Sequence, residues 1–286
     1  MARRLALGGL LAAALLVLPG CAAGETTALP TGVSVSVQQS RADVGIRRLQ
    51  VAVHNDSPDP LRITGLALES AQLAEAAVWA KDTTTVAAGR TVNLPVSLPE
   101  PRCGDEPSAP VALLEFELSD GSRGSARLTA YDPSGRMPRL AAEDCLARDV
   151  AGLASIAATT LPRVESIGGV TVARLDLSVD PTGAPGALLI EEAGGSVLLS
   201  LADPADGARV TTRALGLRVD GRDAASVVTL TLVPARCDPH AIAEDKRGTV
   251  FGLRVAVEGG AAGTYSVAAS DDVKLALYDF VRTACA

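Results

Sequence analysis

The chain carries Leu-Pro-Glu-Pro-Arg-Cys at residues 98–103 and Leu-Val-Pro-Ala-Arg-Cys at residues 232–237. Each copy ends a run in which apolar residues alternate with others, the period of a strand with one buried face. The alternating residues are Leu94, Val96 and Leu98 in the first copy and Val228, Leu230 and Leu232 in the second. One further cysteine follows each copy, at Cys145 and at Cys285. The repeat therefore predicts two copies of one β-domain.

The composition agrees with two packed domains and excludes some kinds of partner. The chain has 286 residues, a length at which about two domains are expected. Hydrophobic residues make up 48% of it, so a packed core can form. Aromatic residues make up 2%, which leaves few rings to stack on sugars or bases. The formal net charge of −7 repels nucleic acid, and we expect no nucleic-acid partner.

The first residues have the pattern of an export signal. Arg3 and Arg4 precede an apolar stretch at residues 5–18, which is shorter than the roughly 20 residues of a membrane span. The stretch ends in Leu-Pro-Gly-Cys at residues 18–21 and resembles the lipobox of bacterial lipoproteins, although Pro19 departs from the usual small residue. The alternative is an ordinary secretory signal in which Cys21 has no role.

The lipobox resemblance implies how the protein is held at a membrane. Residues 1–20 would be a lipoprotein signal peptide, and Cys21 would carry a diacylglyceryl group with acyl chains such as palmitate. Two or more buried chains anchor a protein stably. Residues 21–30 then form a flexible tether. We expect a protein anchored to the cell membrane through Cys21, on its extracytoplasmic face.

The other four cysteines are expected to form disulfides, because an even number in an exported chain is typical of them. Four cysteines allow three connectivities, and pairing within each repeat selects Cys103 with Cys145 and Cys237 with Cys285. A metal–thiolate site is the alternative, but it needs closely spaced cysteine pairs, which the sequence lacks. We therefore predict no metal ligands.

The first domain is expected at residues 31–148. Alternating residues predict strands at residues 33–37 and 49–53, followed by a polar turn and a strand from Leu61, a passage that resembles strands B to C of immunoglobulin-like bacterial domains. Residues 111–118 and 125–131 flank an Asp-Gly turn and predict a hairpin. Pro138 then opens a short helix that reaches Cys145. Residues 149–164 are expected to be a linker.

The second domain is expected at residues 165–286. It opens with a strand over residues 170–179, with a bulge or break near Arg174 where the alternation changes phase. Residues 197–201 and the turn after them parallel residues 49–53 and their turn. Ser270 caps a helix with Asp271 and Asp272 in its first turn. An apolar stripe through Phe280 predicts that this helix packs on the core and ends at Cys285.

One segment contains several side chains of the types that bind metals or act in acid–base catalysis. It contains His240, Glu244, Asp245, Lys246 and Arg247. His240 and Glu244, one helical turn apart, could form half of a metal site or an acid–base pair. The simpler interpretation is a capped surface turn whose charges pair with one another, because further ligands are missing nearby.

Other catalytic patterns are missing from the sequence. It contains no Gly-x-Ser-x-Gly elbow, no Walker loop and no Gly-x-Gly-x-x-Gly motif, and the chain has 2 histidines. We predict no catalytic residues, no cofactor and no enzymatic activity.

The lipobox, the segment from Pro234 to Gly248 and the closing helix up to Cys285 together resemble uncharacterised exported lipoproteins of high-GC Gram-positive (actinobacterial) bacteria. The expected fold is mainly β, with two tandem immunoglobulin-like antiparallel β-sandwich domains, each closed by a short disulfide-stapled C-terminal helix. We expect a non-enzymatic protein-binding or structural envelope protein with an envelope protein partner. The alternative is a lipoprotein that binds a small molecule in the cleft between its domains.

Overall fold

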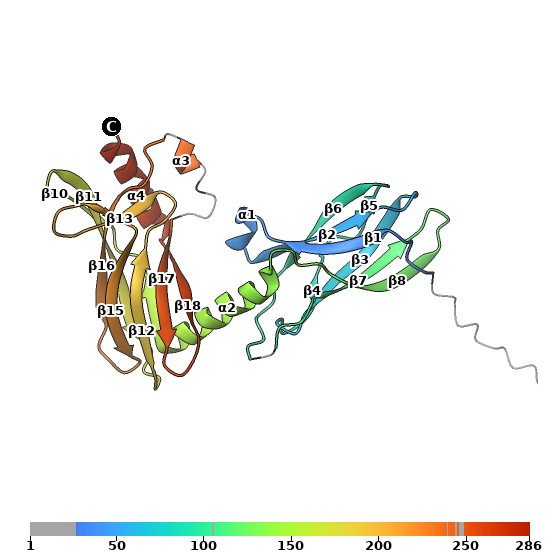
Figure 1. Ribbon diagram of the computed structural model, residues 1–286, viewed down its shortest axis with the longest axis horizontal. Helices are drawn as coiled ribbons and strands as arrows, with labels where there is room; N and C mark the ends of the chain where they lie inside the picture. Colours follow the sequence, from blue (N-terminus) through green and yellow to red (C-terminus); the bar gives the residue numbers. More distant parts are fainter. Residues whose placement is uncertain (1–26, 105, 239, 244, 246–248) are drawn as a thin grey trace, which may run out of the picture.

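The computed structural model describes residues 27–286 apart from residues 105, 239, 244 and 246–248. The described chain is mainly β, as the alternating sequence predicts, with several antiparallel sheets, two disulfides and a C-terminal helix. We call residues 27–135 the first half and residues 154–286 the second half. One helix, α2 (Arg136–Leu153), runs between the strands of the two halves (Figure 1).

The first half contains two antiparallel sheets. The smaller sheet has the order β1-β2-β6, with β1 (Val33–Gln38), β2 (Arg48–Asn55) and β6 (Arg90–Ser97). The larger sheet has the order β4-β3-β7-β8, and β5 also pairs with β3. Its strands are β3 (Leu61–Glu69), β4 (Ala77–Val78), β5 (Thr84–Val86), β7 (Val111–Glu117) and β8 (Arg123–Thr129). The short helix α1 (Arg41–Val44) lies between β1 and β2.

The inner faces of these sheets form what we call the first core. Leu49, Val51 and Val53 of β2 are fully buried, and Leu114 and Phe116 of β7 belong to the same cluster. Trp79 also lies in it. The predicted hairpin is confirmed, because β7 and β8 pair in continuous register on either side of the Asp-Gly turn. Strand alternation thus decides which side chains are buried here.

The second half also contains two antiparallel sheets. A six-stranded sheet has the order β10-β11-β16-β13-β14, with β9 also paired to β11. Its strands are β9 (Ala154–Ala157), β10 (Arg163–Ile167), β11 (Val170–Pro181), β13 (Leu199–Ala202), β14 (Arg209–Val210) and β16 (Ser226–Pro234). A four-stranded sheet has the order β15-β12-β17-β18, with β12 (Ala187–Gly194), β15 (Thr212–Asp220), β17 (Val250–Val257) and β18 (Ala262–Ala268).

The inner faces of these two sheets and helix α4 (Asp271–Ala284) form what we call the second core. The predicted closing helix is confirmed. Ser270 accepts a hydrogen bond from the backbone N–H of Val273, and Phe280 is 3% exposed within the second core. The apolar stripe of α4 therefore packs as its helical spacing predicts.

Strand β11 corrects the expected break near Arg174. It pairs with β16 from Ala173 to Val179 without a register shift. The alternation changes phase because the strand buries both faces: Leu175 and Leu177 enter the second core, whereas Val172 packs with Ala202 and Val233 in a small separate cluster. A change of buried face, rather than a bulge, produces the pattern.

The expected parallel between residues 197–201 and residues 49–53 is wrong. Residues 49–53 lie in β2, a central strand between β1 and β6, whereas β13 lies beyond β16 and pairs with the short β14. The strand in the position of β2 is β11, which lies between β10 and β16. The two segments have similar sequences but occupy different positions in their sheets.

Helix α2 is longer than the short helix expected from Pro138 to Cys145. It continues for 18 residues, and the segment expected as a linker, residues 149–164, contains its last turn followed by β9. Its buried residues fall into two sets. Met137 and Leu140 join the first core, and Leu146, Val150 and Leu153 join the second. No single apolar stripe runs along the helix, which explains why the sequence pattern did not reveal its length.

Candidate functional site

The two disulfides have the predicted pairing. Cys103 bonds Cys145, 42 residues later, and Cys237 bonds Cys285, 48 residues later. In both cases the first cysteine ends the repeated motif, which follows β6 in the first half and overlaps the end of β16 in the second. The second cysteine lies in or next to the helix after a closing hairpin. The repeated cysteines therefore fasten helices to sheets and are not available as nucleophiles.

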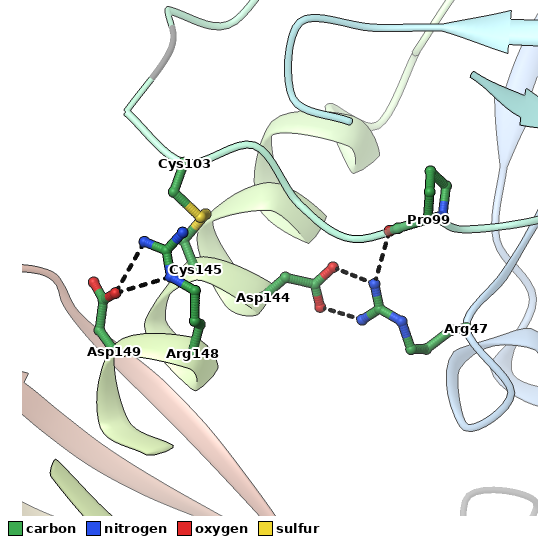
Figure 2. The surroundings of a disulfide bond; sticks show 7 residues. All are labelled: Arg47, Pro99, Cys103, Asp144, Cys145, Arg148 and Asp149. Atoms are coloured by element: carbon green, nitrogen blue, oxygen red, sulfur yellow. Dashed lines mark hydrogen bonds and ion pairs between the residues drawn. A yellow bond between two sulfur atoms is a disulfide. The ribbon is translucent and has the colours of Figure 1, made fainter. Parts of the chain in front are cut away.

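A polar contact lies beside the first disulfide (Figure 2). The guanidinium of Arg47 donates to both carboxylate oxygens of Asp144, at 2.7 and 3.0 Å, and to the carbonyl of Pro99 at 3.2 Å. The hydrogen bond to Asp144 is the main cause that raises the pKa of Arg47. Bidentate pairs of this kind are both stronger and more specific in geometry than single contacts. Sequence reasoning missed this pair because its members are 97 positions apart.

A cavity of about 570 Å3 opens next to this contact, and we call it the junction cavity. One wall comes from α1 and α2 and the other from β18. Its lining residues are Val44, Arg136, Glu143, Asp144, Ala147, Thr264, Tyr265 and Ser266. The charged groups already have partners: Arg136 donates to Glu143 at 3.0 Å and to Gln39 at 2.8 Å. Burial raises the pKa of Tyr265, which leaves its phenol neutral at neutral pH. The cavity can offer hydrogen bonds rather than net charge.

A second hollow, of about 430 Å3, has an apolar lining, and we call it the tyrosine groove. Pro107, Pro110 and Pro138 line it together with Tyr131. The backbone of Tyr131 is fixed to β1, since its N–H donates to Val35 and its carbonyl accepts from Val37. Tyr131 is nevertheless 68% exposed. From the sequence Tyr131 is expected only as the end of a strand. The groove leaves no signal in the sequence, because its prolines come from separate segments.

The segment around His240 is described in part. His240 begins the short helix α3 (His240–Ala243), and its backbone N–H donates to Asp238 at 3.0 Å. That hydrogen bond is the main cause that lowers the pKa of Asp238. Of the predicted cluster, Glu244, Lys246 and Arg247 lie outside the described residues.

Asp245 connects this segment to α4. Its carboxylate accepts a hydrogen bond from the hydroxyl of Tyr278 at 3.0 Å. Burial and this hydrogen bond raise the pKa of Tyr278 to about 12. The other histidine, His54, contacts Thr91 in the first half. Within the described ranges, no group of three or more His, Cys, Asp or Glu side chains is placed to hold a metal ion.

The predicted lipidation site, Cys21, lies outside the described residues. Among residues 27–286, as far as they are described, no helix is both long and apolar enough to cross a membrane.

Comparisons with known proteins add distant likenesses only. No family model and no curated protein matches the chain. Among solved structures, red sea bream transglutaminase is 11% identical over 85% of this chain, with a TM-score of 0.23, and the chain spans 32% of its length. The YadV chaperone is 10% identical over 82% of this chain and 98% of its own, with a TM-score of 0.22.

The calcium-binding domain CBD12 of CALX1.1 is 11% identical over 85% of this chain and 82% of its own, with a TM-score of 0.19. Neither a fold family nor an activity follows from likenesses this distant. The class that the described structure defines is a mainly antiparallel β protein with two disulfides and a C-terminal helix.

Proposed function

We propose that the protein is a lipoprotein anchored through Cys21 to the extracytoplasmic face of the cell membrane. In this proposal it is a non-enzymatic envelope protein that binds another protein through a surface of its first half. The tyrosine groove carries the proposal: an exposed aromatic ring beside three prolines is an apolar surface of the kind that protein partners cover. The junction cavity, by contrast, is lined mostly by polar and charged side chains.

We further propose that the chain consists of two tandem immunoglobulin-like domains, at about residues 31–148 and 165–286. Strand order supports this. The sheets β1-β2-β6 and β3-β7-β8 have the neighbours of immunoglobulin strands A-B-E and C-F-G. In the second half, β10-β11-β16-β13 and β12-β17-β18 have the neighbours of strands A-B-E-D and C-F-G. Domains of this kind bind through surfaces and loops, so the fold alone specifies no reaction.

The anchor is tested by Cys21→Ser in cells that export the protein. Loss of the acceptor thiol should release the protein into the medium or leave it as the unprocessed precursor, because the acyl chains that would anchor the mature protein can no longer be attached. Membrane fractionation and intact mass of the wild type and the variant measure this. A Cys21→Ser protein whose leader is removed and which still fractionates with the membrane as the wild type does would contradict the lipoprotein assignment.

The binding surface is tested by photo-crosslinking in living cells. A photoreactive amino acid replaces Tyr131 in the tyrosine groove, and in a control protein it replaces Leu275, which is 60% exposed on α4. Position 131 should form a specific protein adduct that position 275 does not form. Identical adducts from both positions, or none from position 131, would remove its main support.

The junction cavity favours a second candidate function, the binding of a small polar molecule. Its volume of about 570 Å3 falls in the range of ligand pockets, and Tyr265, Thr264 and Ser266 offer hydroxyl groups. Native mass spectrometry of protein purified from its membrane would detect a bound molecule, and Tyr265→Ala should lose it. A wild-type mass equal to that of the protein without a bound small molecule would contradict this second candidate function.

A further inference from the structure

Helix α2 packs on the two cores with roughly opposite sides. At about 100° of rotation per residue, Met137 and Leu140 point to one side of the helix, and Leu146, Val150 and Leu153 point to the other. Asp144 lies on the side of Met137 and Leu140, where it meets Arg47 (Figure 2). One continuous helix is thus embedded in the first core at its start and in the second core at its end.

Besides the buried residues at its start, α2 makes two contacts with the first half at adjacent positions, Asp144 and Cys145. Asp144 binds Arg47, and the next residue, Cys145, is bonded to Cys103 in the loop after β6. Both lie just before Leu146, the first residue of α2 that belongs to the second core. The helix is therefore held at the position where it passes from one half to the other.

The backbone conformation of Arg47 indicates that surrounding contacts hold this residue in position to bind Asp144. Arg47 has φ of 48°, and it is the one non-glycine residue in the described chain with a positive φ. A left-handed conformation is unfavourable for a residue with a Cβ, so it persists where surrounding contacts hold it. Here the backbone carbonyl of Arg47 accepts from Leu98, and its guanidinium holds Asp144.

We propose that the Arg47–Asp144 ion pair and the Cys103–Cys145 disulfide together form a clamp on α2 that sets the orientation of the second half relative to the first. With the clamp closed, α2 acts as a rigid strut. With it open, the start of α2 is held by Met137, Leu140 and Arg136, and the second half swings on the helix. The clamp requires neither lipidation at Cys21 nor a partner.

The clamp also sets the width of the junction cavity. Asp144 and Val44, which is three residues from Arg47, belong to one wall, and Thr264, Tyr265 and Ser266 of the second half belong to the other. A fixed angle between the halves keeps these walls at a fixed separation. Opening the clamp should therefore change both the orientation of the halves and the access to the cavity.

Distance measurement between the halves tests the clamp in the full chain, purified in detergent. Spin-labelled non-canonical amino acids replace Val78 of β4 and Val227 of β16, which are 60% and 62% exposed, so that no label reacts with a cysteine and neither label lies on a helix held by a disulfide. The wild type should give a narrow distance distribution. The variant Arg47→Ala with Cys103→Ser and Cys145→Ser should give one broader by a factor of about two, as expected of a hinge.

The second disulfide is the matched control, since it closes a loop of similar length but joins the segment after β16 to the end of α4. Cys237→Ser with Cys285→Ser should leave the distribution narrow. Should removal of the first disulfide prevent folding, Arg47→Asp tests the ion pair with both disulfides intact, and Arg47→Asp with Asp144→Arg should restore the narrow distribution. Equal widths in the wild type and every clamp variant, or equal broadening in the control, would overturn the proposal.

Discussion

Asp43 is a charged residue that is 1% exposed, and four donor contacts account for its burial. Its two carboxylate oxygens accept from the backbone and hydroxyl of Ser40, from Arg48 at 2.6 Å and from Gln50 at 3.0 Å. Burial by itself raises the pKa of Asp43, but these hydrogen bonds outweigh it and lower the pKa to about 2. The charged carboxylate therefore stabilises the turn between β1 and β2.

The stability of the protein should depend on the charge of Asp43. The pKa of Asp43 in the folded chain lies below the value of about 3.9 in an unfolded chain. The charged carboxylate therefore makes its full contribution to the unfolding free energy above about pH 5, and this contribution disappears as the pH falls towards 2. Compared with Asp43→Asn, the wild type should lose about 2 kcal/mol of unfolding free energy over that interval. Urea unfolding at pH 7, 4 and 2 measures the difference, with exposed Asp82→Asn as the control. A difference that does not vary with pH would refute this account of Asp43.

Two threonines of β16 differ in how their hydroxyls are satisfied. Thr231 is fully buried, and its hydroxyl has no hydrogen-bond partner among the described residues. Thr229, two residues earlier on the same face, donates to Asp176 at 2.7 Å. An unsatisfied buried hydroxyl costs free energy, whereas a satisfied one contributes to stability.

Thr231→Val should therefore raise the unfolding free energy by about 1 kcal/mol, and Thr229→Val should lower it by about 1 kcal/mol. Valine keeps the branched shape that suits a strand, so the pair isolates the hydroxyl. Equilibrium urea unfolding of both variants checks the opposite signs. Destabilisation of similar size in both would show that the hydroxyl of Thr231 is satisfied.

At the scale of elements, α4 and α2 contrast in how their apolar residues are arranged. In α4 the buried residues Val273, Leu277, Phe280 and Val281 share one face against the second core. In α2 the buried residues divide between two cores. The first arrangement is visible in a sequence as a stripe, and the second is not.

The stripe of α4 predicts large effects on its inner face and small ones outside it. Phe280→Ala should lower the unfolding free energy by about 3–5 kcal/mol, because it leaves a cavity in the second core. Leu275→Ala, on the exposed face of the same helix, should change it by less than about 0.5 kcal/mol. Thermal and urea unfolding compare the two. Equal losses would mean that the outer face of α4 is also packed.

At the scale of the whole molecule, α2 belongs to the second core as much as to the first. A chain of residues 136–286 with Cys145→Ser should be more stable than a chain of residues 154–286, because Leu146, Val150 and Leu153 fill part of that core. Burial of three aliphatic side chains contributes about 4 kcal/mol or more, and the entropy cost of ordering the helix reduces the net difference. Urea unfolding of the two chains measures it. Equal stabilities would show that the second core closes without α2.

The cysteine pairing followed from the sequence through the repeat, although its partners are 42 and 48 residues apart. Features encoded in neighbouring residues also followed from the sequence alone: the strands with period two, the hairpin at the Asp-Gly turn and the amphipathic α4. Their signals are local, because alternation and helical spacing reflect which side of one element is buried. Other features that join distant segments had no such signal. The Arg47–Asp144 contact, the tyrosine groove, the two faces of α2 and the two buried faces of β11 were decided by the tertiary structure, because each depends on which sheets and helices pack together.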